Sequence, residues 1–224
     1  MRRDVFINGG TGYIGAALVT ALLARGHRVL VLARPVSMAR VPAGAEPIVG
    51  NALDAGSIAS ASSGADTLVQ LVGTAHPEPS KAAEFKSVDL ASAKAAVDAA
   101  GRVAIAHFIY VSVAQPAPVM QAYIAARVEA EQAIRDAGMA ATIVRPWYVV
   151  GPGHWWPIVL VPFYALARWI PATRDMAERL GLVTLDQMVD ALVRSVESPP
   201  ERGEVRIVDV AGIKQIGKST RTQR

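Results

Sequence analysis

The segment GGTGYIG, Gly9–Gly15, decides how this chain folds. It follows an apolar run at Asp4–Asn8, which predicts a strand, and it opens a helical pattern from Gly12 to Arg25 that stops at Gly26. A strand, a glycine turn and a helix in this order bring unpaired N–H groups and the positive end of the helix dipole to one place, where a phosphate can bind. A glycine-rich segment is also compatible with a plain turn, but its position between strand and helix favours nucleotide binding.

Three of the four glycines in this segment, Gly9, Gly12 and Gly15, have separate expected roles. Gly9 and Gly12 let the backbone turn and approach a pyrophosphate, whereas Gly15 permits close packing of the helix on the strand. Tyr13 and Ile14 lie in the same turn and complete the predicted cofactor contacts there. The spacing is GxxGxxG, which differs from the GxGxxG of many dehydrogenases.

Along the rest of the chain, short runs rich in Val and Ile alternate with longer Ala-rich segments. This alternation predicts parallel strands joined by crossover helices. Further strands are expected at residues 28–32, 47–50, 67–71, 107–111, 140–145 and 204–210. Helices are expected from Asp54 onward, over 80–100 with a stop at Gly101, over 121–137 with a stop at Gly138, and over 186–197. The expected fold class is α/β, a doubly wound parallel sheet (Rossmann fold) with a small C-terminal substrate-side region.

Length and composition predict one domain, because 224 residues with 52% apolar side chains can bury a single substantial core. We expect one dinucleotide-binding Rossmann domain over residues 1–212, with 151–200 forming the substrate-side region and 213–224 a disordered basic tail. That tail carries four basic residues and no acid, so the net charge of +4 leaves the rest of the chain formally neutral. A neutral body argues against nucleic acid binding, which needs a basic face spread over the fold.

The sequence argues against several kinds of site and against secretion or insertion in a membrane. The chain has no Cys, and its four His show no metal-ligand spacing, so no disulfide, thiolate site or other metal site is expected. No signal peptide is apparent, and the longest apolar stretch, residues 155–170, is too short and too broken by Pro to span a bilayer. These features are compatible with an intracellular, cytoplasmic protein.

The end of the second predicted strand bears on the choice of dinucleotide. A ribose 2′-OH is usually bound by an acid there, whereas a 2′-phosphate needs a cation. This strand ends in Ala33 and Arg34 with no Asp or Glu, so NADP(H) is favoured and NAD(H) remains the alternative. The alternative for Arg34 is a surface arginine at a strand end.

Two further loops fall at the predicted ligand edge of the sheet. Asn51, Ala52 and Leu53 follow the third strand and are expected near an adenine ring. Gly73 follows the fourth strand, at the carboxyl edge where ligands of doubly wound sheets bind. Each of these segments is also compatible with ordinary loop chemistry.

Four motifs occur in an order that suggests a family. GGTGYIG, YVSV at 110–113, Tyr123–Arg127 and RPWYVVGPG at 145–153 together resemble the extended short-chain dehydrogenase/reductase superfamily over about Met1–Val210. The likeness is greatest to its atypical, NmrA-like branch, which includes the NAD(P)H-binding accessory subunit of respiratory complex I. Extended members usually carry a larger C-terminal part, so by this resemblance the chain looks reduced.

The resemblance implies roles for three residues. Ser112 matches the serine that polarises a carbonyl, Tyr123 matches the proton donor, and Arg127 stands where a lysine is usual. Tyr123 and Arg127 are four residues apart on a predicted helix, so they share a face, and a cation there would lower the pKa of the phenol. Arg127 cannot release a proton in practice, which leaves the relay role of the lysine in question. The alternative for Ser112 and Tyr123 is a helix cap and an ordinary half-buried aromatic.

By the same resemblance, the segment after the sixth strand lies beside the nicotinamide. Pro146 has no N–H to donate, so the backbone amides of Tyr148 or Val149 are expected to meet the carboxamide. Arg145 is interpreted as a structural arginine in an ion pair. His76 and His154 lie on the predicted ligand side and are candidates for a substrate contact.

Two functional hypotheses follow. The first is an NADP(H)-dependent reductase that acts on an apolar carbonyl-type small molecule; the second is a non-catalytic dinucleotide-binding regulator or accessory subunit, favoured by Arg127 and by the aromatic stretch 154–171. That stretch is compatible with a pocket wall, with a face that docks on a partner protein or membrane surface, or with core packing.

Overall fold

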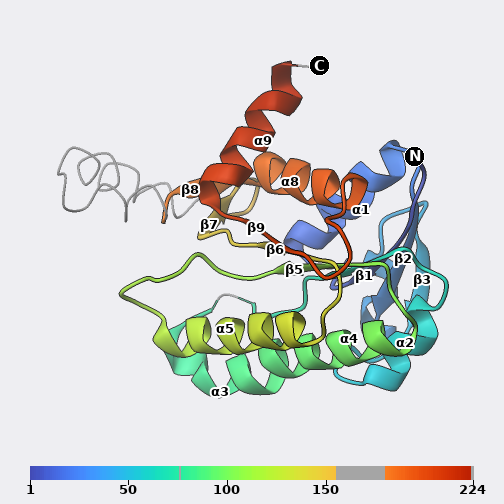
Figure 1. Cartoon of the computed structure of the whole chain (residues 1–224), viewed down its shortest axis with the longest axis horizontal. Helices are drawn as coiled ribbons and strands as arrows, with labels where there is room; N and C mark the ends of the chain where they lie inside the picture. Colours follow the sequence, from blue (N-terminus) through green and yellow to red (C-terminus); the bar gives the residue numbers. More distant parts are fainter. Residues whose placement is uncertain (76, 155–179, 223–224) are drawn as a thin grey trace.

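A computed structural model describes residues 1–75, 77–154 and 180–222 of the chain (Figure 1). Its centre is a parallel seven-stranded sheet in the order β3-β2-β1-β4-β5-β6-β9. The strands are β1 Asp4–Asn8, β2 Arg28–Ala33, β3 Glu46–Val49, β4 Thr67–Gln70, β5 His107–Val111, β6 Ala141–Val144 and β9 Val205–Val208. The predicted α/β doubly wound fold is therefore confirmed, and the change of direction in strand order lies between β1 and β4.

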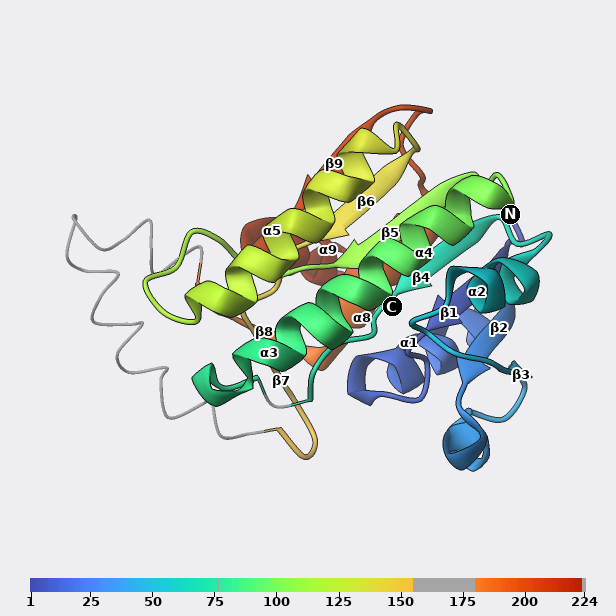
Figure 2. The same ribbon diagram turned by 90° about the horizontal axis from the view of Figure 1, so that it is seen from below.

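Helices cover both faces of this sheet. The helices are α1 Tyr13–Ala24, α2 Ala55–Ser62, α3 Ala82–Glu84, α4 Ala91–Arg102, α5 Gln121–Asp136, α8 Leu185–Glu197 and α9 Val210–Thr222. Figure 1 shows α1, α8 and α9 on one face, and Figure 2 shows α4 and α5 running side by side across the other. Because each face is covered, the inner strands are buried on both sides, which explains their continuous apolar runs.

The two cores are built from alternate residues of the same strands. Val5 and Ile7 of β1 pack toward α1 and α8, whereas Phe6 packs toward α4 and α5. All three side chains are fully buried. This alternation fixes the register of β1 between β2 and β4, and with it the position of the glycine loop that follows.

The predicted helix ends are partly confirmed. Gly26 and Gly138 close their helices with φ of +79° and +61°, the left-handed conformation that glycine adopts without strain. The expected stop at Gly101 is wrong, because α4 continues to Arg102 and the left-handed residue is Ala104, with φ of 53°. Asp54 caps α2 as expected, through a bond from the Gly56 N–H.

The expected disordered tail from residue 213 is wrong as far as Thr222. Helix α9 spans Val210–Thr222 and packs on α8. Val210, Ile213 and Gly217 are buried at a spacing of three and four residues, so an apolar stripe holds the helix down. The basic residues of this segment lie outside this stripe, so the charge of the segment does not indicate disorder. Residues 223 and 224 lie outside the described part of the chain.

Two further departures concern the ligand edge. A separate two-stranded parallel sheet joins β7 Tyr148–Val150 to β8 Leu182–Thr184, which the sequence did not predict. The expected helix over 80–100 is divided into a short 3-10 turn, α3, a π-helical stretch at Phe85–Leu90 and α4. The wide turn brings Asp89 into the interior, where it is fully buried. Such π-helical turns often occur at functional sites.

Candidate functional site

A cavity of about 690 Å³ lies at the carboxyl edge of the sheet, where the strand order changes direction. This is the place where doubly wound sheets bind ligands, and the volume falls within the range of small-molecule sites. Its wall comes from the loops after β1, β4, β5 and β6 and from the start of α5. Of the predicted site residues, the cavity is lined by Gly9, Gly12, Tyr13, Ile14, Gly15, Gly73, Ser112, Tyr123, Pro146, Tyr148 and Val149.

The glycine loop forms one end of this cavity. Gly9 has φ of +95°, and a Cβ on it would meet the backbone of Leu71 and Val72 at 3.0 Å, so the loop lies close against the end of β4. The Gly12 N–H donates to the Gly9 carbonyl at 3.1 Å, and the first bond within α1 runs from Ala16 N to Gly12 O. The N–H groups between these two belong to the first turn of the helix, where anions bind.

Replacing Gly15 by Ala tests this packing. The added Cβ would overlap the Gly9 carbonyl oxygen and crowd the Gly10 Cα, and both are backbone atoms that can only move by opening the loop. We expect a loss of about 2 kcal/mol in the free energy of unfolding, with weaker dinucleotide binding, because overpacked sites cost about 1–3 kcal/mol.

The matched control for this variant is Gly101→Ala. Gly101 is helical and lies in α4, and an added Cβ would meet none of the described residues within 4 Å, so Ala should leave stability unchanged or raise it slightly. Thermal unfolding with and without NADPH measures both variants. A Gly15→Ala protein that matches the parent in both conditions would show that the close approach of loop and helix is unimportant.

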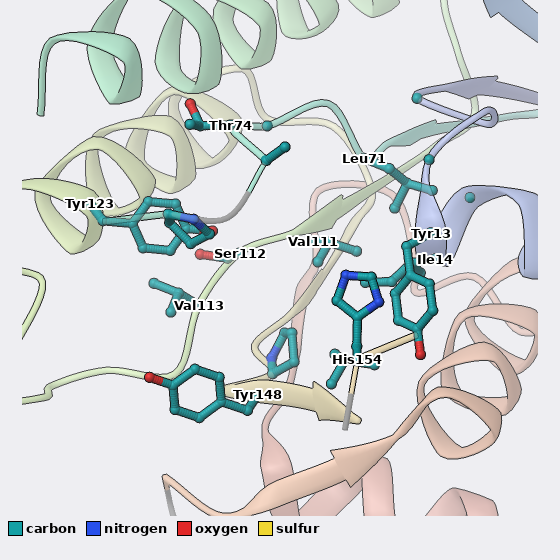
Figure 3. Close-up of a pocket in the computed structure, with 18 of the residues that line it drawn as sticks. Tyr13, Ile14, Leu71, Thr74, Val111, Ser112, Val113, Tyr123, Tyr148 and His154 are labelled. Atoms are coloured by element: carbon teal, nitrogen blue, oxygen red, sulfur yellow. The ribbon is translucent and has the colours of Figure 1, made fainter. Parts of the chain in front are cut away.

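A pair of aromatic rings stands beside the loop. The side chains of Tyr13 and His154 lie next to each other in Figure 3. Their ring centroids are 4.0 Å apart and the ring planes are tilted by 32°. Burial, and secondarily the charge of Asp186, raise the pKa of the Tyr13 phenol above its usual value. The Tyr13 hydroxyl approaches Gly151 so closely that a Cβ there would overlap it. His154 lines the cavity, and its predicted contact with a substrate stays a prediction. His76 and residues 155–171 of the predicted aromatic stretch lie outside the described residues.

At the other end of the cavity Tyr123 stands on α5, near Ser112 and Val113 in Figure 3. Its ring meets Phe85 edge to face, with 5.0 Å between centroids. The Arg127 guanidinium carbon lies 4.9 Å from the centroid of the Tyr123 ring, so the cation stacks on the ring. Tyr123 and Arg127 thus share one face of α5, as predicted. The guanidinium lies over the aromatic ring of Tyr123.

Arg127 is held in the interior by a buried ion pair. Its Nη2 donates to Asp89 Oδ1 at 2.5 Å, and its Nη1 donates to the Val111 carbonyl at 3.0 Å and to the Tyr110 hydroxyl at 3.2 Å. Burial acts to lower the pKa of Arg127, but its phenol and carboxylate neighbours raise it overall, so the group stays charged. Arg127 is 5% exposed and does not line the cavity. Its expected contact with a cofactor ribose therefore has no support from this geometry and stays a prediction.

Gly73 is explained by the same ion pair. A Cβ at this position would overlap Arg127 Nη2 and lie 3.0 Å from Asp89 Oδ1. Asp89 Oδ2 also accepts from the backbone N–H of Thr74 at 2.9 Å and from its hydroxyl at 2.6 Å. The pair thereby fixes the loop after β4 on the cavity wall.

Ser112 has a buried carboxylate as its partner. Its hydroxyl donates to Glu131 Oε1 at 2.7 Å, and Glu131 also receives two bonds from Arg145. The predicted ion pair of Arg145 is therefore confirmed, with Glu131 as its acid. Burial would raise the pKa of Glu131, but the hydrogen bonds and charge of its donors outweigh this and lower it.

Five predicted site residues lie away from the described cavity wall: Arg34, Asn51, Ala52, Leu53 and Arg127. Asn51–Leu53 form the turn before α2, in which Asn51 Oδ1 accepts from the Leu53 N–H at 3.0 Å. Arg34 follows β2 and is exposed. Their predicted contacts with an adenine and a 2′-phosphate stay predictions.

Sequence reasoning missed Asp89 and Glu131, whereas Thr74, which follows Gly73 at the predicted ligand edge, does line the cavity. A signal for Glu131 was present, because it stands four residues after Arg127, which stands four after Tyr123, so all three share one face of α5. Asp89 gave no such signal, because its burial depends on the π-helical turn.

Comparison with known proteins places the chain among nucleotide-binding proteins. A family model described as NAD(P)H-binding matches residues 9–151. The chain is 30% identical over 212 residues to a ceramide reductase of Caulobacter vibrioides (strain NA1000 / CB15N), covering 93% of this chain and 65% of that protein. It is 29% identical over 168 residues to a 4-hydroxy-2-methyl-3-oxo-4-farnesyl-3,4-dihydroquinoline-1-oxide ketoreductase of Stigmatella aurantiaca, covering 65% of this chain and 50% of that protein. The chain thus spans about half to two thirds of these relatives.

Among solved structures, MoeE5 in complex with UDP-glucose and NAD superposes with a TM-score of 0.67 at 17% identity. The match covers 97% of this chain and 81% of MoeE5. At this identity the likeness concerns the fold. Within the described residues, no helix has both the length and the apolar character needed to cross a bilayer.

Proposed function

The chain belongs to the NAD(P)H-binding family and has the fold of extended short-chain dehydrogenases/reductases, and from this premise we propose that it is an NADP(H)-dependent reductase of apolar carbonyl compounds. The observation that carries the proposal is one cavity with a phosphate-type glycine loop at one end and Tyr123 at the other. Relatives named as a ceramide reductase and a farnesylated quinoline ketoreductase agree with an apolar substrate.

The residues present fit a dinucleotide. Outside its own helix and its two chain neighbours, a Cβ added to Gly12 would meet just one atom of the described residues within 4 Å, the Gly9 carbonyl oxygen at 3.3 Å. The bare backbone therefore leaves room for a pyrophosphate beside the helix start. Pro146, Tyr148 and Val149 also line the cavity, and a nicotinamide ring would be held beside them. When bound, the nicotinamide supplies the hydride for the carbonyl carbon.

The chain's own residues would orient the carbonyl and supply its proton. Tyr123 lies on the cavity wall and would give the phenolic proton to the developing alkoxide. The Arg127 cation is stacked on the Tyr123 ring and would hold this ring in position at the cavity wall. Val113, Trp147 and Pro77 line the described cavity with apolar surface, which suits an uncharged substrate and limits water.

The preference for NADP(H) depends on Arg34. No Asp or Glu stands at the end of β2, and the exposed guanidinium of Arg34 offers a fork of donors to a 2′-phosphate. We expect NADPH to raise the melting temperature of the parent more than NADH, and Arg34→Ala to weaken NADPH binding about tenfold while leaving NADH binding unchanged.

Arg102→Ala serves as the control for this experiment. Arg102 is an exposed arginine of α4, paired with Asp98 four residues away, and its loss should alter neither affinity. Equal responses of the parent to NADPH and NADH would disprove the preference for NADP(H) and leave dinucleotide binding itself intact.

The second candidate function is a binding protein that uses the dinucleotide for stability or signalling, without turnover. It is favoured by one observation: the guanidinium of Arg127 is occupied by Asp89, Tyr110 and Val111, and it acts on the described cavity through the stacked ring of Tyr123. Binding of NADPH by a parent protein that reduces none of a panel of apolar aldehydes and ketones would favour this candidate.

A further inference from the structure

The direction of the hydrogen bond at Ser112 bears on what this residue offers a ligand. Ser112 lies on the cavity wall directly after β5, and it is 4% exposed. A serine hydroxyl has one proton to donate and two lone pairs that accept. The partner that takes the proton therefore determines which kind of ligand group Ser112 can still bind.

The partner of Ser112 is a carboxylate surrounded by donors. Glu131 is 1% exposed, and its Oε1 accepts from Ser112 at 2.7 Å, from Arg145 Nε at 2.9 Å and from Gln115 at 3.1 Å. Its Oε2 accepts from Arg145 Nη2 at 2.5 Å and from Arg135 at 3.0 Å.

These five contacts determine which partner donates the proton in the hydrogen bond between Ser112 and Glu131. All the other partners of Glu131 present N–H groups, so a proton on the carboxyl would face a donor on either oxygen. Two guanidinium groups also favour the ionised form. The proton between Ser112 and Glu131 consequently belongs to Ser112 and points away from the cavity.

We propose that Glu131 holds Ser112 as a hydrogen-bond acceptor, and that Ser112 binds an N–H or O–H group of the ligand in the cavity. This inference rests on the proposed function and changes the role that the family resemblance suggested, because a hydroxyl whose proton is taken cannot polarise a carbonyl. The donor group has two sources: the carboxamide NH₂ of the nicotinamide, or the hydroxyl of an alcohol product.

The cofactor source is tested with NADP⁺ and its acetylpyridine analogue, in which a methyl group replaces the carboxamide NH₂. Binding to the full chain is followed by its tryptophan fluorescence, to which Trp147 on the cavity wall contributes. If the carboxamide is the donor, the parent binds NADP⁺ about three- to tenfold more tightly than the analogue, the worth of one neutral hydrogen bond. In Ser112→Ala the two affinities become equal.

The alcohol source is tested with the NADP⁺-saturated protein and a matched pair of probes, benzhydrol and its ketone benzophenone. If the product hydroxyl is the donor, the parent binds the alcohol about three- to tenfold more tightly than the ketone, and Ser112→Ala removes the difference. The variant should fold, because Glu131 keeps four N–H donors without Ser112.

Ser62→Ala is the matched control for both arms. Ser62 is a fully buried serine at the end of α2 and does not line the cavity, so both preferences should persist in this variant. Preferences that survive Ser112→Ala, or equal affinities in both arms of the parent, overturn the inference. A parent that binds no dinucleotide at all gives a different result, the failure of the proposed function itself.

Discussion

Arg127→Met is expected to lower the free energy of unfolding by about 3–5 kcal/mol, because it leaves the buried carboxylate of Asp89 without its cation. Asp89 would keep the N–H and hydroxyl of Thr74 as donors, which do not neutralise its charge. Methionine fills much of the space that the arginine stem occupied, so the loss reports on the charge. Urea unfolding of parent and variant measures the change.

A double-mutant cycle separates the ion pair from the packing. Asp89→Asn combined with Arg127→Met removes both charges, and the double variant should be more stable than the sum of the two single losses predicts. The control is Arg102→Met, whose exposed pair with Asp98 should contribute less than about 1 kcal/mol. An Arg127→Met protein as stable as the parent would show that the pair is weak.

Tyr123→Phe is expected to reduce NADPH-dependent turnover of an apolar ketone by about a hundredfold to ten-thousandfold, the usual contribution of a general acid. Phenylalanine keeps the edge-to-face contact with Phe85 and the stacked contact with Arg127, so the fold and the cofactor affinity should persist. Steady-state rates and NADPH titration, measured on the same protein, distinguish lost chemistry from lost binding.

Tyr110→Phe makes the same chemical change one layer behind the cavity. Tyr110 is fully buried, and burial raises the pKa of its phenol to about 12, so its hydroxyl stays protonated at neutral pH. Its removal should cost stability through the bond from Arg127 and leave turnover within a few-fold of the parent. Unchanged turnover in Tyr123→Phe would refute the acid role of Tyr123.

The sequence was sufficient for the sheet because its signals are local. The inner strands of the main sheet are short runs of mostly apolar residues, and β1 and β5 have the predicted bounds. The glycine loop was equally legible, since its position between a strand and a helix is a feature of adjacent residues. Family resemblance added the relevant serine, tyrosine and arginine.

The partners of those three residues could not be predicted in the same way. Asp89 is 38 residues from Arg127, and Glu131 is 19 residues from Ser112, so their pairing depends on how α4, α5 and β5 pack. A π-helical turn, which no short-range pattern announced, places Asp89 in the interior. The C-terminal segment was wrongly predicted as disordered for another reason: its charges suggest a solvated tail, whereas its apolar residues have the three- and four-residue spacing of a helix.

The close packing of Gly73 against Arg127 predicts how these two positions vary among relatives of this chain. The guanidinium of Arg127 occupies the space that a side chain at position 73 would need. These two positions, though 54 residues apart in the numbering of the chain, are therefore under one shared constraint. In a homologue with a shorter residue at position 127 this overlap is absent, and alanine or serine at position 73 requires only a small shift of Asp89, whose Oδ1 would lie 3.0 Å from the added Cβ. Substitutions at positions 73 and 127 should therefore be inherited together.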